Sequence, residues 1–302
     1  MLKHLRTLLM SASVVALATA AAAKDRVALI VGNGAYQNQA PLANPTNDAE
    51  DVASLLRSLG FEVIEGRDLN KRDLERKLKE FRQKLEDMET TGNDDPDSSP
   101  PVALFYYSGH GLQVAGRNFV IPVDAKIEKQ SDADFEGVDM EAILRAMSGS
   151  GWASVIVLDA CRDNPYARSL ARSMKGGATR GGESAFAGLA EMKAQNGSFI
   201  IYATDPGNVA LDGDGRNSPF TTAFLKNAPR PGIDLSRMMI HIRYDVMRAT
   251  GDKQNPRDAS SLMRPVYLGA PPAPLVQQAA LQTDAPRIGN PAPRRDLTPD
   301  PN

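Results

Sequence analysis

Four apolar runs of strand length constrain the fold of this chain more than any other feature of its sequence. Each run is rich in β-branched or aromatic residues and ends in small or polar ones, as is typical of a buried strand. Segments with helical spacing separate the runs, and this alternation predicts an α/β fold with a layered, mostly parallel sheet. The runs are RVALIVGN (26–33), VALFYYS (102–108), WASVIVLDA (152–160) and GSFIIYAT (197–204).

The segments between these runs place apolar residues on one helical face, which predicts helices that pack against the sheet. The first of them starts with a capping residue and stops before Gly60, where a second short strand begins. In such a sheet the functional loops gather at the carboxyl ends of the strands. The predicted helices cover 46–59, 70–89, 218–226 and 234–249, the short strand is FEVIE (61–65), and VYLG (266–269) closes the domain.

The amino-terminal residues predict export. A positive stretch with Lys3 and Arg6 precedes an apolar run and then small residues that suit a signal peptidase, so residues 1–23 are interpreted as a signal peptide. A membrane anchor is the alternative, but the run is rich in Ala and shorter than the ~20 residues that a spanning helix needs. We therefore expect a periplasmic or secreted protein with no stable membrane span.

The remaining chain of this 302-residue sequence is long enough for one or two domains. A net charge of −2, with basic and acidic residues interspersed, excludes the basic stripe of a nucleic-acid-binding protein. We predict one domain over 24–268, a long loop with little periodicity over 162–196, and a disordered Pro- and Ala-rich tail over 269–302.

The single cysteine, Cys161, directly follows the third apolar run. In an oxidising compartment stabilising cysteines come in pairs, so a lone thiol needs either a chemical role or deep burial. A cysteine nucleophile requires an imidazole beside it. Of three histidines, His4 lies in the signal and His241 in a predicted helix, which leaves His110 in SGHG at the end of another buried strand. The structural alternatives are a histidine that fills a loop and a cysteine that is only a small buried side chain.

Three motifs, YYSGHG (106–111), LDACRDNP (158–165) and NPTNDAEDVASLL (44–56), resemble those of the caspase-like cysteine peptidase superfamily, and more closely its bacterial metacaspase-like (orthocaspase-type) members. YATDPG (202–207) and DGDGRNSPFTTAFL (212–225) extend the resemblance over about 26–268. The resemblance implies a caspase-like three-layer α/β/α sandwich with a central, mostly parallel six-stranded sheet. Its two halves would cover about 26–167 and 197–268, joined by a linker over about 168–196.

The resemblance also implies the roles of the site residues. Cys161 would be the nucleophile, His110 the general acid and base, and the main-chain amides of Gly111 and Cys161 the oxyanion hole. In caspases the His lies roughly 50 residues before the Cys, a spacing that His110 and Cys161 match.

A substrate preference follows from the same resemblance. Asp48, Ser108 and Asp159 match the pocket that in metacaspases binds Arg or Lys before the scissile bond. Asp159 replaces the Gln, and Asp163 the Gly, of the animal caspase motif. The partner is therefore expected to be a peptide or protein substrate with Arg or Lys at that position. The alternative is that Asp48 caps a helix and Asp159 orients a loop.

No cofactor or metal is expected. GNGAY (32–36) lacks the third glycine of a dinucleotide-binding loop, and DGDGRN (212–217) lacks the distal Glu of a calcium loop and is interpreted as a turn. Some metacaspases bind calcium through several aspartates. Asp124 and Asp139 match two of them, but Arg168 stands where a further Asp is expected, which argues against calcium dependence.

The sequence therefore predicts a cysteine-type endopeptidase. Two other functions remain open: a catalytically silent caspase-like module that binds partners, and a different cysteine hydrolase such as an acyltransferase. Self-cleavage is expected in the linker, where a basic-specific site would accept Arg168, Arg172, Lys175 or Arg180.

Overall fold

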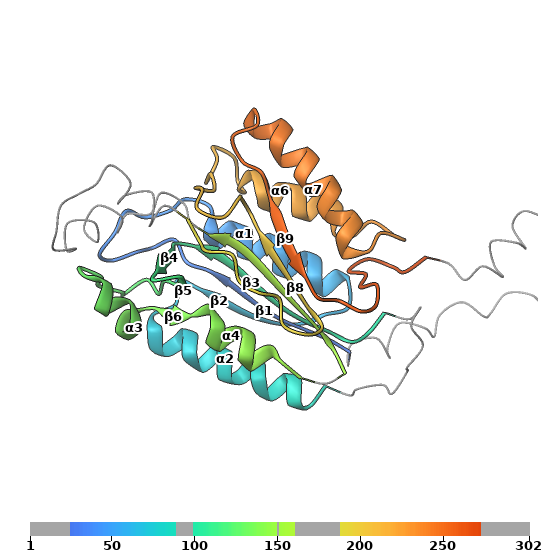
Figure 1. Cartoon of the computed structure of the whole chain (residues 1–302), viewed down its shortest axis with the longest axis horizontal. Coiled ribbons are helices and arrows are strands. Elements are labelled where there is room, and N and C mark those ends of the chain that lie inside the picture. The colour runs from blue at the N-terminus through green and yellow to red at the C-terminus, as the bar shows by residue number, and fades with distance from the viewer. Residues whose placement is uncertain (1–24, 89–98, 150, 161–187, 273–302) are drawn as a thin grey trace, which may run out of the picture.

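The computed structural model describes residues 25–88, 99–149, 151–160 and 188–272 (Figure 1). Several predictions fall outside these residues. They are the signal peptide over 1–23, Cys161, the four basic linker residues with Asp163, and nearly all of the tail.

A six-stranded sheet forms the centre of the domain, with the strand order β2-β1-β3-β7-β8-β9 (Figure 1). Neighbours among the first five are parallel, and β9 runs antiparallel to β8. The inner strands β3 and β7 are buried along their whole length, which explains their continuous apolar runs. The strands are β1 (Arg26–Gly32), β2 (Glu62–Arg67), β3 (Val102–Gly109), β7 (Ala153–Ala160), β8 (Ser198–Tyr202) and β9 (Arg257–Ser260).

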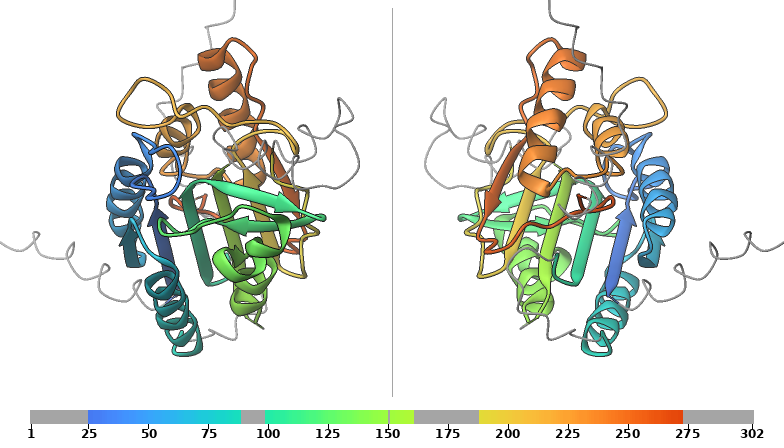
Figure 2. Two further views of the ribbon diagram at one scale, coloured as in Figure 1. Left: turned by 90° about the vertical axis from the view of Figure 1, so that its left-hand side faces the viewer. Right: turned by 90° about the vertical axis from the view of Figure 1, so that its right-hand side faces the viewer.

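Helices cover both faces of the sheet and make the three layers that Figure 2 shows nearly edge-on. One face carries α1, α6 and α7 and the other α2 and α4, so alternate residues of each strand contact opposite helix layers. The predicted α/β/α sandwich is confirmed. The helices are α1 (Pro45–Ser58), α6 (Pro219–Asn227), α7 (Leu235–Thr250), α2 (Lys71–Glu86) and α4 (Met140–Met147).

A second, three-stranded sheet follows β3 and has the order β4-β5-β6. In the left view of Figure 2 it crosses the strand ends of the main sheet. This sheet was not predicted from the sequence. Its elements are β4 (Gly111–Val114), β5 (Arg117–Val120) and β6 (Val138–Asp139), accompanied by a 3₁₀ turn (Gln130–Asp132) and α3 (Ala133–Glu136).

The sixth strand of the main sheet is β9, a segment that the sequence analysis did not single out. VYLG is not a strand, but Val266 and Leu268 are buried against the core, so it does close the domain. The Arg26 guanidinium holds this end in place by donating to the carbonyls of Tyr267 (3.1 Å) and Leu268 (2.8 Å). In the part of the chain described here, no helix has both the length and the apolar character needed to cross a membrane.

Candidate active site

His110 lies between β3 and β4, at the carboxyl edge of the main sheet. Gly109 before it has φ of +155°, and a Cβ there would lie 2.6 Å from the Tyr36 hydroxyl and 2.7 Å from the Tyr107 hydroxyl. A side chain at this position would therefore collide with two buried tyrosines. This close approach explains the first glycine of GHG and fixes the direction in which the chain enters His110.

The imidazole of His110 is buried, with 2% of its surface exposed. Its Nε2 lies 3.1 Å from the carbonyl oxygen of Ala40. Because a carbonyl only accepts hydrogen bonds, this contact assigns the proton of the neutral ring to Nε2. The other nitrogen, Nδ1, is then the one that can take up a proton.

Cys161 lies outside the described residues, but strand β7, which ends at the residue before it, is part of the main sheet. Strands β3 and β7 are parallel neighbours in which Ser108 pairs with Asp159 and Gly109 pairs with Ala160. His110 and Cys161 therefore directly follow two residues that are register partners on strands about 4.8 Å apart. Gly111, the other expected oxyanion donor, opens β4 opposite Val120.

The Asp48 carboxylate is fully buried in the first turn of α1. Its Oδ2 accepts a hydrogen bond from Ser108 Oγ (2.9 Å), and its Oδ1 accepts one from the main-chain N–H of Ser218 (3.0 Å). The N-cap of α1 is Asn44, not Asp48. The carboxylate thus links α1 to β3 and to the segment before α6, and the capping alternative does not account for its contacts.

Asp159, at the end of β7, is also fully buried. Its Oδ2 accepts hydrogen bonds from the hydroxyls of Ser218 and Thr221, the latter at 2.9 Å. The Tyr106 hydroxyl lies 2.6 Å from Thr221 Oγ1 and donates to it, because the single Thr221 proton goes to the carboxylate. Three hydroxyls therefore fix the orientation of the Asp159 side chain.

Ser218 joins the two carboxylates. Its N–H donates to Asp48 and its Oγ to Asp159, while that Oγ also caps α6 by accepting from the N–H of Thr221 (2.8 Å). The structure therefore brings together all three residues that the sequence analysis assigned to a specificity pocket. Two buried carboxylates linked through one serine concentrate negative charge at this edge of the sheet.

The loop before Ser218 is attached to the start of α1. Asp212 Oδ2 accepts from the N–H of Ala43 (3.0 Å), and its carbonyl accepts from Asn44 Nδ2 (2.7 Å). Arg216 makes ion pairs with Asp51 (2.9 Å) and Glu50 (3.0 Å), and its hydrogen bonds hold the pKa of the Asp51 carboxyl below its usual value. DGDGRN therefore forms an irregular loop that docks on the helix carrying Asp48.

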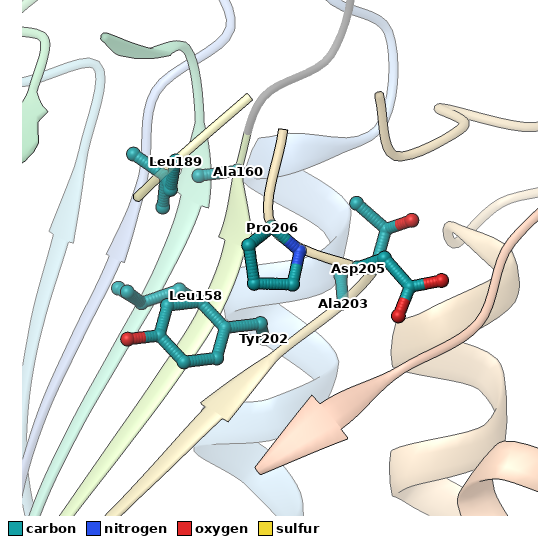
Figure 3. Close-up of a pocket in the computed structure, with 8 residues that line it drawn as sticks. Leu158, Ala160, Leu189, Tyr202, Ala203, Asp205 and Pro206 are labelled. Atoms are coloured by element: carbon teal, nitrogen blue, oxygen red, sulfur yellow. The ribbon is translucent and has the colours of Figure 1, made fainter. Parts of the chain in front are cut away.

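A small pocket lies at the carboxyl ends of β7 and β8, beside Ala160 (Figure 3). Apolar side chains line most of it, and its cavity volume of about 10 Å³ is that of one water. It is therefore a small gap in the packing at the ends of these strands. Its lining residues are Leu158, Ala160, Leu189, Tyr202, Ala203, Thr204, Asp205 and Pro206.

The two aspartates that match calcium ligands of some metacaspases have structural contacts here. Asp139 caps α4 by accepting from the N–H of Glu141 (2.8 Å), and it pairs with Arg117 (2.5 Å). Asp124 accepts from the N–H of Lys71 (3.0 Å). Within the described ranges no group of three acidic, His or Cys side chains is arranged to hold a metal ion.

Sequence reasoning missed four parts of this site. Ser218 and Thr221 lie in SPFTTAFL, which was interpreted only as a helix, although a Ser before Pro at a helix start is an N-cap signal. Asp212 lies in a motif interpreted as a turn. The carbonyl of Ala40 belongs to the main chain, so residue type gives no signal for it.

Two curated proteins are similar to part of this sequence. The chain is 31% identical over 141 residues to mucosa-associated lymphoid tissue lymphoma translocation protein 1 of Homo sapiens, and the homologue of Mus musculus gives the same values. The match covers 46% of this chain but only 15% of either relative, so the chain spans a small part of those proteins.

A solved structure and a family model extend the comparison to the whole domain. The crystal structure of caspase-1 from Spodoptera frugiperda superimposes with a TM-score of 0.54 at 16% identity, covering 89% of this chain and 100% of that one, which shows a shared fold. The family model described as the caspase domain matches residues 25–267. This match includes every element described above, and the chain therefore belongs to the caspase-domain family of cysteine peptidases.

Proposed function

We propose that this protein is a cysteine endopeptidase that cuts peptide bonds after Arg or Lys, with Cys161 as nucleophile and His110 as general acid and base. The family supports a peptidase, and the arrangement around His110 supports its role. One observation carries the specificity: the buried carboxylates of Asp48 and Asp159 are joined through Ser218 at the same sheet edge as His110.

In the proposed reaction His110 acts first as a general base and then as a general acid. Nδ1 takes the proton of the Cys161 thiol, and the thiolate attacks the carbonyl carbon of the scissile bond. Main-chain N–H groups of Gly111 and Cys161 donate to the oxyanion that forms. The imidazolium then protonates the leaving amine as the C–N bond breaks. A water that gives a proton to His110 hydrolyses the acyl-enzyme and restores the thiol.

In this proposal the substrate's guanidinium or ammonium group lies between Asp48 and Asp159. The hydroxyls that bind Asp159 hold its carboxylate in place before substrate arrives, which lowers the entropy cost of binding. A planar guanidinium forms two hydrogen bonds with a carboxylate, so Arg is expected to be preferred to Lys. Asp212, half-buried beside the start of α1, is a third acidic side chain next to the helix that carries Asp48.

A substrate scan tests this proposal. Fluorogenic peptides that differ only in the residue before the scissile bond are incubated with the purified protein, with calcium and with a chelator. We expect cleavage after Arg, slower cleavage after Lys, none after Asp, and no change on chelation. Cleavage after Asp would overturn the pocket assignment, and no cleavage of any peptide would favour the catalytically silent module.

We also propose export to the periplasm or the medium, on the basis of the amino-terminal sequence. Mass spectrometry of the protein from its native host is expected to find a chain that begins near Lys24. Replacing Val15 by Arg breaks the apolar run and should leave uncut precursor in the cell. A parent protein that keeps Met1 and stays in the cytoplasm would contradict this prediction.

A further inference from the structure

The loop over residues 33–42 contains the rest of GNGAY, a motif that the sequence analysis excluded as a nucleotide site and left without a function. In the structure this loop lies against His110. We propose that Tyr36 is a positioning residue for His110, which holds the imidazole in the orientation and tautomer that catalysis needs. This inference rests on the proposed function, because it assigns a task to Tyr36 within the same site.

Tyr36 contacts His110 in two ways. The Tyr36 hydroxyl accepts a hydrogen bond of 2.7 Å from the main-chain N–H of His110. Its ring packs on the imidazole with 4.3 Å between ring centroids and 43° between planes. Only 7% of Tyr36 and 2% of His110 are exposed, so neither contact competes with bulk water. One side chain thus fixes both the main chain and the ring of His110.

His110 lies between β3 and β4, outside both strands, so its main-chain N–H needs an acceptor other than a neighbouring strand of the main sheet. The Tyr36 hydroxyl is that acceptor. The Tyr107 hydroxyl donates to the carbonyl of His110 (2.8 Å), and the Tyr36 hydroxyl accepts from the main-chain N–H of His110. The two hydroxyls lie 3.2 Å apart. The His110 carbonyl also accepts a hydrogen bond from the main-chain N–H of Ile121 (3.2 Å), whereas its N–H donates to the Tyr36 hydroxyl. A buried N–H without an acceptor is costly, so removing the Tyr36 hydroxyl should let His110 shift.

The same loop also sets the tautomer of the ring. Ala40, four residues after Tyr36, supplies the carbonyl oxygen 3.1 Å from His110 Nε2. Tyr36 holds the ring against this oxygen, and the proton on Nε2 leaves Nδ1 as the base. A shift of the ring by about 1 Å would weaken this contact and misplace Nδ1, a change that can cost about 100-fold in rate.

Hydrogen bonds with neighbouring segments anchor the start of the loop. Asp68 Oδ1 accepts hydrogen bonds from the N–H groups of Gly34 and Ala35, both at 2.8 Å. The buried Asn33 side chain accepts from the N–H of Leu69 (2.9 Å) and donates to the carbonyl of Ile121 (3.1 Å). These contacts anchor both the strand end and the loop, so the position of Tyr36 is set by the fold itself.

The test uses full-length Tyr36→Phe, which removes only the hydroxyl, and Tyr36→Leu, which also removes the ring. Tyr36→Phe is expected to lower kcat about 10-fold to 100-fold with KM within about twofold, because it misplaces the base and not the substrate. In a His110→Ala background the same change should have almost no further effect. An equal loss in both backgrounds would show that Tyr36 does not act through His110.

A second measurement needs no activity and so separates this inference from the proposed function. In Cys161→Ala protein, nitrogen NMR of the His110 ring should report the Nε2–H tautomer, with a growing share of Nδ1–H in Tyr36→Phe and Tyr36→Leu. Tyr244→Phe is the control, because it removes the hydroxyl of an exposed tyrosine on α7 that accepts a hydrogen bond from Arg248 (3.1 Å). It should leave the His110 signals unchanged. Identical His110 spectra in the parent and both Tyr36 variants would overturn the inference, whether or not the protein cuts peptides.

Discussion

Replacing Cys161 by Ala is expected to reduce peptide hydrolysis by about 10⁴-fold or more while the domain stays folded. The thiol is the only one in the chain, so no other side chain can form the thioester intermediate. His110→Ala should lower the rate nearly as much, because Cys161 and His110 act as one catalytic unit. For the same reason the double variant should lose little more than either single variant. Initial rates of Arg-peptide hydrolysis, measured for both single variants and the double variant and compared with the parent, test this non-additivity.

Two controls accompany this experiment. Thermal unfolding should show a melting temperature near that of the parent for Cys161→Ala, since a thiol is replaced by a small side chain of similar polarity. Asp245→Asn changes an acidic residue on α7 that pairs with Lys226, far along the chain from the dyad, and should keep the parent's rate. If either dyad variant retains more than about 1% of the parent's rate, the assignment of Cys161 and His110 is wrong.

The strands that continuous apolar runs predicted are those buried on both faces of the sheet. Strands β1, β3 and β7 have no exposed residue in their interiors, so their apolar runs are continuous and their limits clear. Strand β9 reads RDAS and is partly exposed throughout, and β4, β5 and β6 have four, four and two residues. Such short, partly polar strands carry no periodic signal, because their pairing depends on tertiary contacts.

The candidate site shows the same division. His110 was predicted because it follows a buried strand and is one of only three histidines. Ser218 was missed because its partner Asp159 lies 59 residues earlier in the chain, and only the fold brings the two together. The carbonyl of Ala40 could not be predicted, since every residue type offers one. Sequence patterns thus predicted a side chain such as His110, whereas its hydrogen-bond partners come from distant segments and depend on the fold.

Specificity is expected to depend on the charge of Asp159. Asp159→Asn keeps an oxygen that can accept from Ser218 and Thr221 but removes the negative charge, so the side chain should stay in place while the pocket binds Arg less well. Truncating one member of a buried charge pair costs about 2 to 5 kcal/mol, which corresponds to a fall of about 30-fold to several thousand-fold in kcat/KM for an Arg peptide. Steady-state kinetics on Arg, Lys and uncharged peptides of the same length measure this loss.

The loss should fall on substrate recognition and leave the nucleophile intact. Alkylation of Cys161 by iodoacetamide should proceed at the parent's rate in Asp159→Asn, because the reagent does not use the pocket. Asp48→Asn should behave in the same way, since its carboxylate is joined to that of Asp159 through Ser218. Asp245→Asn again serves as the matched control, with an unchanged preference for Arg. If Asp159→Asn cuts Arg peptides as well as the parent and at normal alkylation rates, the two carboxylates do not bind the substrate cation. Their role would then be confined to joining α1 and β7 to the segment that begins α6.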